Sequence, residues 1–348
     1  MISSIFFCIV AQAQDFELYT LKNGQGISMA VTNYGARIVS LRVPDRHGNY
    51  DDIVCGFDTI GSYARYKQNY GAVVGRYIGR ILGAKFSLDG RTYHLGAEKN
   101  GHYSHGVKPG FANVFWTVES RTDSTLSLQY VSPDGESGFP GELKITVIYT
   151  LTDANELAIH YSATTDRPTV LNPSNHSFFN ISGDFSSTVL DQHLQIDADS
   201  IALYDETKCV TGKLMSVSDS PFDFRCPATI GKHIDDDHPQ LKVTGGYDHA
   251  FRLNHPGDIN RVAARIHDDK SGRTMEVYTT EPALQIYTAN GLKANVPGKN
   301  GIRYARRTAI CFETMHFPDS PNKPHWPSTV LRPGQTFNST TVFKFLFY

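Results

Sequence analysis

Apolar and polar residues alternate in short runs along most of the chain. Between positions 27 and 43, alternate apolar residues fall on one face of an extended segment, a turn follows at positions 33–35, and the pattern then resumes. The apolar positions are Ile27, Met29, Val31, Ile38, Leu41 and Val43. Alternation of this kind is typical of half-buried β-strands. We therefore predict two strands joined by a turn.

The segment 143–164 shows the same alternation of apolar and polar residues on both sides of an Asp-Ala-Asn turn at positions 153–155. Similar runs occupy positions 124–131, 192–204, 273–280, 283–290 and 342–348. No segment longer than ten residues shows the 3.6-residue period of a helix. Many short strands, with turn signals about every 8 to 12 residues, indicate a β-sandwich or barrel. We predict a single all-β domain over residues 14–348.

Composition narrows the possible partners. Of 348 residues, 33 are Lys or Arg and 35 are Asp or Glu, so the charge balance argues against binding to nucleic acid or to an anionic membrane. The 18 Tyr and 20 Phe would supply aromatic walls for a small neutral ligand. After the first residues no apolar stretch approaches the length of about 20 residues that a membrane helix needs, so we expect no membrane insertion.

The N-terminal segment has the features of a secretory leader. An apolar run from Ile5 to Val10 precedes Ala11-Gln12-Ala13, a small-x-small pattern typical of a cleavage site. We predict that residues 1–13 are a signal peptide and that the mature protein is periplasmic or secreted. The cysteines that would remain have no Cys-x-x-Cys spacing, and their sequence leaves their pairing open. They are Cys55, Cys209, Cys226 and Cys311.

His176 lies in the segment NPSNHSFFN, where residue type alone favours a structural histidine held by a hydrogen bond. His102 and His105 resemble a zinc pair, but no third ligand follows at metal spacing. The acidic run 235–237 has no calcium-loop pattern and is better interpreted as a solvated loop. We expect no metal site.

Five further segments change the interpretation of His176, because together with it they resemble the aldose 1-epimerase, or galactose mutarotase, family. They are VVGRYIGRI with Arg80, YSHGVKPGF with His105, GGYDHAF with Asp248, EPALQIYTANGL with Gln285, and ICFETMHFPDSPNKPHWPSTVLRPG with Glu313. The resemblance runs from Tyr19 to Phe337 with the segments in family order, and the segments around His176 and Glu313 are the most specific.

The resemblance implies a large antiparallel β-sandwich of the galactose mutarotase-like type, with an open sugar-binding cleft. It implies that His176 is the general acid, that Glu313 is the general base and that His105 is a second active-site histidine. It also assigns Arg80, Asp248 and Gln285 to the hydroxyls of the sugar. The family pattern differs here at Gly79, Val107 and Met315, which leaves the preferred aldose open.

The implied reaction interconverts the α and β anomers of a hexose such as galactose or glucose by opening and closing the ring. A carboxylate can take the proton of the C1 hydroxyl while an imidazolium protonates the ring oxygen, so the chemistry needs no cofactor. A glycoside hydrolase would instead need two carboxylates flanking the glycosidic bond. Two alternatives stay open: a non-catalytic sugar-binding module, and a hexose-6-phosphate 1-epimerase, for which we find no basic cluster near the motifs.

Overall fold

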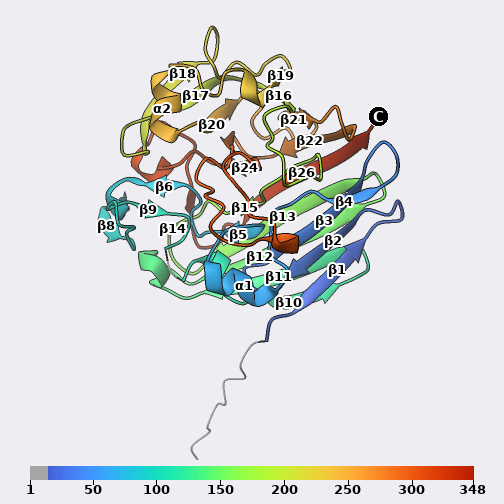
Figure 1. Cartoon of the computed structure of the whole chain (residues 1–348). Coiled ribbons are helices and arrows are strands. Elements are labelled where there is room, and N and C mark those ends of the chain that lie inside the picture. The colour runs from blue at the N-terminus through green and yellow to red at the C-terminus, as the bar shows by residue number, and fades with distance from the viewer. Residues whose placement is uncertain (1–14, 108) are drawn as a thin grey trace, which may run out of the picture.

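The computed structural model describes residues 15–107 and 109–348, and the predicted leader at positions 1–13 lies outside this part (Figure 1). Strands dominate, as predicted. Within residues 15–107 and 109–348 the two α-helices are α1 (Ile60–Tyr66) and α2 (Pro239–Thr244), and neither exceeds seven residues. Single 3-10 turns occur at Leu82–Ala84, Phe111–Asn113, Glu136–Gly138, Ile230–Lys232, Lys299–Gly301 and Ser320–Asn322. No helix in the described part is long and apolar enough to cross a bilayer.

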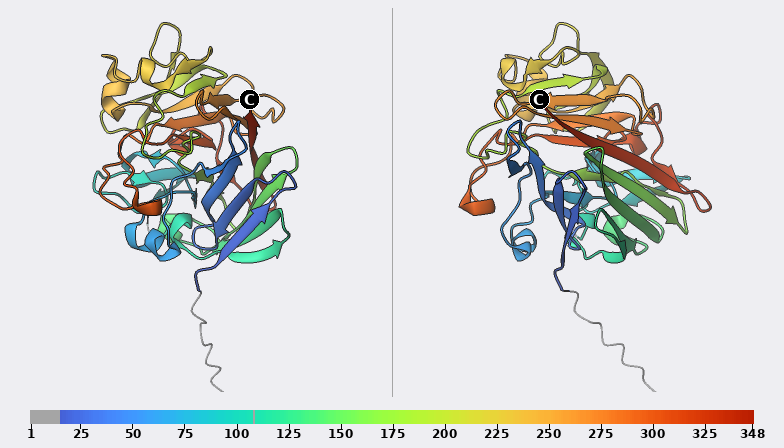
Figure 2. Two further views of the ribbon diagram at one scale, coloured as in Figure 1. Left: turned by 45° about the vertical axis from the view of Figure 1, so that its right-hand side comes forward. Right: turned by 90° about the vertical axis from the view of Figure 1, so that its right-hand side faces the viewer.

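The largest sheet has nine antiparallel strands. In spatial order they are β10 (Thr117–Arg121), β11 (Thr125–Ser132), β12 (Leu143–Thr152), β13 (Glu156–Thr165), β26 (Phe337–Phe347), β22 (Arg273–Thr279), β21 (Ala264–His267), β16 (His193–Ile196) and β19 (Ala228–Thr229). The C-terminal strand β26 lies between β13 and β22, and its long diagonal course is plain in Figure 2. It therefore joins two halves of the sheet that come from different parts of the chain.

The hairpin of β12 and β13 confirms the predicted alternation. Its turn includes Asn155 in a left-handed conformation, at a φ of 60°. Val147 lies opposite Tyr161 and Tyr149 lies opposite Ile159, and all four side chains are buried. Ile148 and His160, which lie between them and pair with each other, are only partly buried and point to the opposite face, as the two-residue period of a strand requires.

A four-stranded sheet contains the first predicted strand pair. Its strands are β1 (Leu18–Lys22), β2 (Ser28–Thr32), β3 (Arg37–Pro44) and β4 (Tyr50–Asp52). The register between β2 and β3 shifts next to Val31. This bulge lets Ile38 and Leu41 both point into the core although they are three positions apart.

A five-stranded sheet completes the sandwich, and one of its faces carries the candidate site. Its order is β18 (Val210–Ser216), β17 (Ala198–Tyr204), β20 (Asp248–Leu253), β23 (Ala283–Tyr287) and β24 (Cys311–Met315). The apolar run 192–204 is divided: β16 joins the nine-stranded sheet and β17 joins this one. The largest buried apolar cluster takes side chains from all three sheets, which confirms the predicted antiparallel sandwich.

Four short strand pairs lie outside these three sheets. They are β5 (Ala72–Val74) with β15 (Ser174–His176), β6 (Arg80–Ile81) with β9 (Tyr103–Ser104), β7 (Lys85–Leu88) with β8 (Arg91–His94), and β14 (Thr169–Val170) with β25 (Val330–Leu331). Two of them, β5 with β15 and β6 with β9, contribute His176 and Arg80 to the site. Cys55, Cys209, Cys226 and Cys311 are free thiols, and only Cys226 is exposed.

Candidate active site

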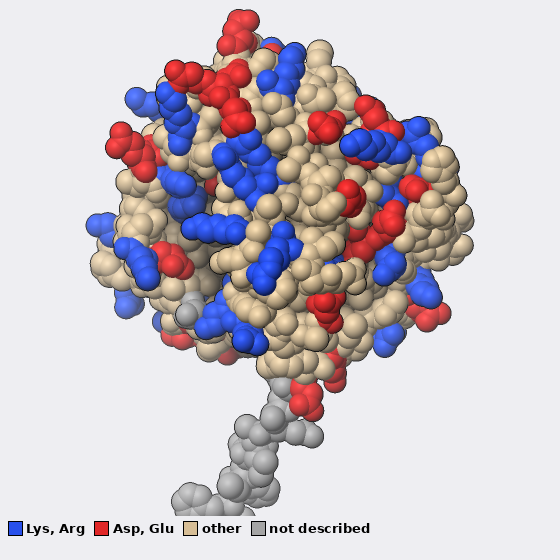
Figure 3. All heavy atoms as spheres, in the orientation of Figure 1, with Lys and Arg blue, Asp and Glu red and all other residues tan. Residues whose placement is uncertain are grey.

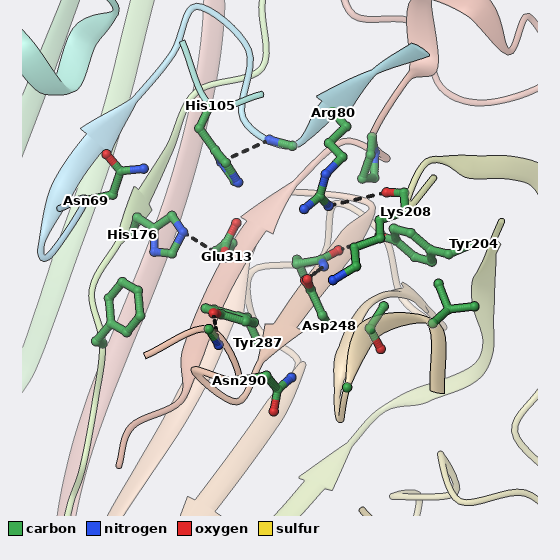
Figure 4. Close-up of a pocket in the computed structure, with 18 of the residues that line it drawn as sticks. Asn69, Arg80, His105, His176, Tyr204, Lys208, Asp248, Tyr287, Asn290 and Glu313 are labelled. Atoms are coloured by element: carbon green, nitrogen blue, oxygen red, sulfur yellow. Dashed lines mark hydrogen bonds and ion pairs between the residues drawn. The ribbon is translucent and has the colours of Figure 1, made fainter. Parts of the chain in front are cut away.

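A cavity of about 620 Å³ opens at one face of the five-stranded sheet (Figure 4). The structure brings all six predicted site residues to its wall, although they are spread over much of the sequence. They are Arg80, His105, His176, Asp248, Gln285 and Glu313. Their shared location is a fact of the structure, whereas the role of each residue is a prediction.

The sheet register explains why three of these residues point into the cavity. Gln285 on β23 lies directly opposite Glu313 on β24, so the two side chains share a face of the sheet. Asp248 on β20 lies opposite Tyr287, two positions along β23 from Gln285, and therefore points to the same side. This face forms the floor of the cavity.

His176 reaches the cavity because its two neighbours are anchored on the other side of β15. The Asn175 amide donates to the Gly71 carbonyl at 2.9 Å, and the Ser177 hydroxyl donates to the Asn175 side-chain oxygen at 2.6 Å. The Gly71 amide in turn donates to the His176 carbonyl at 3.1 Å. The flanking residues thus fix the backbone, and the alternation of the strand turns the imidazole toward Glu313.

His176 and Glu313 form a buried acid–base pair. The His176 Nε2 lies 3.4 Å from Glu313 Oε1, and the two residues are 5% and 2% exposed. Burial lowers the pKa of His176 and raises that of Glu313 well above its usual value, because it disfavours the charged form of each. Asp248 reinforces the shift of the Glu313 pKa, and Arg80 opposes it. The pair therefore favours one shared proton near neutral pH.

His105 follows β9 in a left-handed conformation, at a φ of 54°, and its ring centre lies 5.4 Å from that of His176. Burial, His176 and Arg80 lower its pKa well below the usual value, so it is neutral near pH 7. The Gly79 amide donates to its Nδ1 at 3.4 Å. Since Nδ1 accepts, the proton of the neutral ring lies on Nε2, which becomes a hydrogen-bond donor.

Asp248 is held by a chain of buried hydrogen bonds. Gln285 donates from Nε2 to Asp248 Oδ1 at 2.6 Å, and the Tyr204 hydroxyl donates to Gln285 Oε1 at 2.9 Å. Burial raises the pKa of Asp248, while the positive charge of Arg80 lowers it. Gln285 is thus engaged at both ends of its amide, so it positions Asp248 as well as lining the cavity.

Several lining residues were not among the predicted site residues. Phe178 stacks on His176 with ring centres 4.9 Å apart, and Tyr287 meets the imidazole edge-on at 6.5 Å. Asn69, Tyr204 and Asn290 also line the cavity. Phe178 and Tyr287 lie within two positions of His176 and Gln285, so the strand period could have indicated them. Asn290 lies in the segment EPALQIYTANGL but was not selected, and no motif contains Asn69 or Tyr204.

Three of the site residues are close enough to share a metal ion. One ligand atom each from His105, His176 and Glu313 lies within 4.8 Å of the others. The sequence offered no third ligand near His105 because the other two come from distant strands. His102 is not part of this group, and its Nδ1 accepts from the Gly83 amide at 3.0 Å.

Two of the positions that differ from the family pattern are neighbours in the cavity wall. A Cβ added at Gly79, whose φ is 81°, would lie 3.3 Å from Met315 Cε and 3.2 Å from Pro318 Cβ. The Met315 side chain therefore occupies the space next to the missing side chain of residue 79. The two differences act together on the shape of the wall.

The fold and the cavity define the class of protein first, a galactose mutarotase-like β-sandwich. The solved structure of the GalM/aldose epimerase homologue from C. elegans superimposes with a TM-score of 0.89, at 30% identity, over 95% of this chain and 99% of that one. Galactose 1-epimerase from Lactobacillus acidophilus gives a TM-score of 0.81 at 25% identity, again over 95% and 99% of the two chains.

Sequence comparison then gives the family. The profile of the family described as aldose 1-epimerase matches residues 17–344. Galactose mutarotase from Homo sapiens is 40% identical over 315 residues, 90% of each chain, and aldose 1-epimerase from Escherichia coli is 36% identical over 340 residues, 97% of each chain. This chain belongs to the aldose 1-epimerase family.

Proposed function

We propose that the protein is a mutarotase that interconverts the α and β anomers of a free hexose such as galactose or glucose. The observation that carries the proposal is the contact between His176 and Glu313, 3.4 Å apart and almost fully buried at the floor of a sugar-sized cavity. A binding module needs hydroxyl partners but has no need of a desolvated acid and base.

In the proposed reaction the single proton of the pair moves from Glu313 to His176 as the sugar binds. The Glu313 carboxylate then accepts the proton of the C1 hydroxyl while the bond between C1 and the ring oxygen breaks. His176 donates its proton from Nε2 to that oxygen, which leaves the open-chain aldehyde, a protonated Glu313 and a neutral His176. Rotation about C1–C2 presents the other face of the carbonyl. Ring closure then returns the proton of Glu313 to the carbonyl oxygen, and His176 recovers a proton from the attacking hydroxyl.

The other site residues hold the sugar in register for these transfers. Arg80 donates to hydroxyls, Asp248 accepts from them, and the neutral His105 donates from Nε2. Such positioning lowers the activation barrier, because the translational and rotational entropy of the sugar is already lost when it binds. Every proton in the cycle is carried by the side chains of the chain itself.

The test is the optical rotation of freshly dissolved α-galactose, α-glucose and α-xylose with purified protein. We expect a first-order approach to the equilibrium rotation that is faster than the spontaneous reaction and proportional to protein concentration. A folded protein that binds galactose without accelerating the change would instead be a sugar-binding module.

A further inference from the structure

Two histidines and an aspartate converge on the solvent-facing side of the nine-stranded sheet. His193 on β16 lies directly opposite His267 on β21, so the two imidazoles share a face of the sheet. The His193 Nε2 lies 3.1 Å from Asp269 Oδ2, and the His267 Nε2 lies 3.1 Å from Asp269 Oδ1. One carboxylate thus contacts both rings. The three side chains line a cavity of about 410 Å³ that shares none of its described lining residues with the candidate active site.

The turn after β21 holds Asp269 in this position. The Asp268 side chain accepts from the Ser271 amide at 2.7 Å, and the Asp268 carbonyl accepts from the Gly272 amide at 2.8 Å. The Arg46 guanidinium donates to the Asp269 carbonyl at 2.8 Å. These bonds fix the backbone of the turn, and the Asp269 carboxylate stays within reach of both imidazoles.

Asp269 has no basic side chain to balance its charge. Acidic and basic side chains are interspersed on the face shown in Figure 3, and Arg265 in the same cavity as Asp269 pairs with Glu276. Within residues 15–107 and 109–348, no Lys or Arg nitrogen lies within 4 Å of the Asp269 carboxylate. Its ion-pair partners are the two imidazoles, which compensate its charge only when they are protonated. A bound metal ion would supply the missing positive charge.

The ligand types and their separations suit a divalent transition-metal ion. Zinc binds imidazole nitrogen and carboxylate oxygen at about 2.0–2.2 Å, usually in a tetrahedron, so two such ligand atoms lie about 3.4 Å apart. The distance of 3.1 Å from each Nε2 to its carboxylate oxygen is close to this value. The ring centres are 6.5 Å apart, so the imidazoles must turn toward each other to bind one ion. The His193 and His267 side chains are 35% and 30% exposed, which leaves room for this rotation.

Thr274 adds the outer hydrogen bond that metal-binding histidines commonly make. It lies opposite His267 on β22, and its Oγ1 is 2.8 Å from His267 Nδ1. When Nδ1 donates to this hydroxyl, the neutral ring has its lone pair on Nε2, the atom that faces Asp269. A lone pair and a carboxylate oxygen at 3.1 Å need a proton or a metal ion between them. The hydrogen bond to Thr274 thus orients the imidazole for metal binding.

We propose that His193, His267 and Asp269 bind a divalent transition-metal ion such as Zn²⁺, with water completing its coordination. The histidines bind through Nε2 and the aspartate through its carboxylate. The ion links β16 to β21 and to the turn that follows, so it stabilises this part of the sheet and takes no part in the reaction at the other cavity. The sequence did not indicate the site, because 76 positions separate His193 from Asp269.

The test titrates Zn²⁺ into metal-free protein by calorimetry, in saturating galactose to occupy the active site. We expect one equivalent to bind that galactose does not displace. His193→Gln and His267→Gln should each weaken this binding at least about tenfold, and Thr274→Val should weaken it about tenfold because the imidazole loses its orienting partner. These variants leave the active-site ligands unchanged, so the loss of one equivalent reports the proposed site alone.

His255→Gln is the matched control. His255 contacts a single carboxylate, that of Asp197 at 2.6 Å, and lies outside the cavity, so its loss should leave zinc binding unchanged. An equal loss of zinc binding in this control would overturn the inference.

Thermal unfolding in saturating galactose gives a second measurement. Zn²⁺ should raise the unfolding midpoint of the unchanged protein and of His255→Gln, but not that of the double variant His193→Gln/His267→Gln, because a ligand that binds only the folded state stabilises it. Circular dichroism checks that all three proteins are folded. If the unchanged protein and the double variant bind the same number of zinc equivalents, or if zinc raises their midpoints equally, the inference is overturned.

Discussion

Gln285 lies directly across from Glu313 on the neighbouring strand, yet its amide nitrogen is bound to Asp248 at 2.6 Å. Its carbonyl oxygen accepts from the Tyr204 hydroxyl at 2.9 Å. One residue thus links the strand that carries the proposed base to the carboxylate that is expected to hold the sugar. The structure adds a positioning role to a residue that the sequence indicated only as a sugar contact.

Loss of the sugar-binding side chains should act mainly on KM. Arg80→Ala and Asp248→Ala each remove a hydrogen bond between a charged side chain and the sugar. Such a bond typically contributes about 1.5 to 3 kcal/mol to binding, so we expect KM to rise roughly ten- to hundredfold. Gln285→Leu should act in the same direction, because it leaves the partly buried Asp248 without its donor. Tyr204→Phe removes one hydroxyl and serves as the milder comparison. Steady-state mutarotation measures the effect, and an unchanged KM in both alanine variants would contradict the assignment.

Glu313→Gln should abolish most of the turnover while preserving binding. The amide keeps the shape of the side chain but cannot accept the proton of the C1 hydroxyl, so kcat should fall by about 10² to 10⁴. The kcat of His176→Gln should fall by a similar factor. The loss in the double variant should be smaller than the product of the two single losses, because acid and base act in the same ring-opening step. Polarimetry gives the rates and calorimetry with galactose gives the affinity.

Circular dichroism on the same samples checks that these variants are folded. If Glu313 and His176 only shape the cavity, rate and affinity will decline together. Nearly normal mutarotation by folded Glu313→Gln would be incompatible with the proposed mechanism.

The pH profile of kcat/KM should be bell-shaped, with limbs that belong to the His176–Glu313 pair as a unit. The active form holds one proton. Burial lowers the His176 pKa, so the doubly protonated pair loses its first proton below the usual histidine value, and activity rises there. Burial raises the Glu313 pKa, so the last proton leaves well above the usual carboxyl value, and activity is lost there. In Glu313→Gln only His176 titrates, so the residual activity should fall as pH rises through the lowered His176 pKa, far below the alkaline limb of the unchanged protein, and an alkaline limb that stays in place would refute the assignment.

Divalent metal ions should inhibit rather than activate. The proposed steps use only side chains, so dialysis against a strong chelator should leave the rate unchanged. Added Zn²⁺ can bind His105, His176 and Glu313, whose ligand atoms lie within 4.8 Å of one another, and should compete with sugar. Rates with and without saturating galactose test the competition. A rate that falls on dialysis and returns with zinc would show that a metal takes part.

The leader remains a prediction of the sequence. The apolar run from Ile5 to Val10 and the Ala-Gln-Ala that follows indicate cleavage after Ala13 and a periplasmic or secreted protein. N-terminal sequencing of the protein from fractionated cells gives the answer directly. An intact Met1 in the cytoplasmic fraction would show that the segment is no signal.

The alternation of apolar residues predicted the strands well because the period of a strand is a local property. It could not give the partner of each strand. The run at 192–204 reads as one extended segment, but its halves pair in different sheets, and that division depends on contacts with β21 and β20 far along the chain. The bulge that brings Ile38 and Leu41 to one face likewise depends on the register with β2.

The same limit applies to the site. His176 and Glu313 lie in specific motifs, so the resemblance could predict that their side chains lie together in one active site. The hydrogen-bond link from Tyr204 through Gln285 to Asp248 has no shared motif, because these three residues meet only through tertiary folding. Local sequence could therefore identify the proposed reacting groups better than the contacts that position the groups around them.

The central position of β26 bears on how the protein reaches its native state. Until residues 337–347 have been synthesised, β13 and β22 lack the strand that separates them, and each is an open edge with unpaired amides and carbonyls. Pairing across such long sequence separations is slow because much chain entropy is lost before the contacts form. The two edges are thus the places where a stalled or incompletely synthesised chain is most prone to aggregate, and insertion of β26 removes both at once.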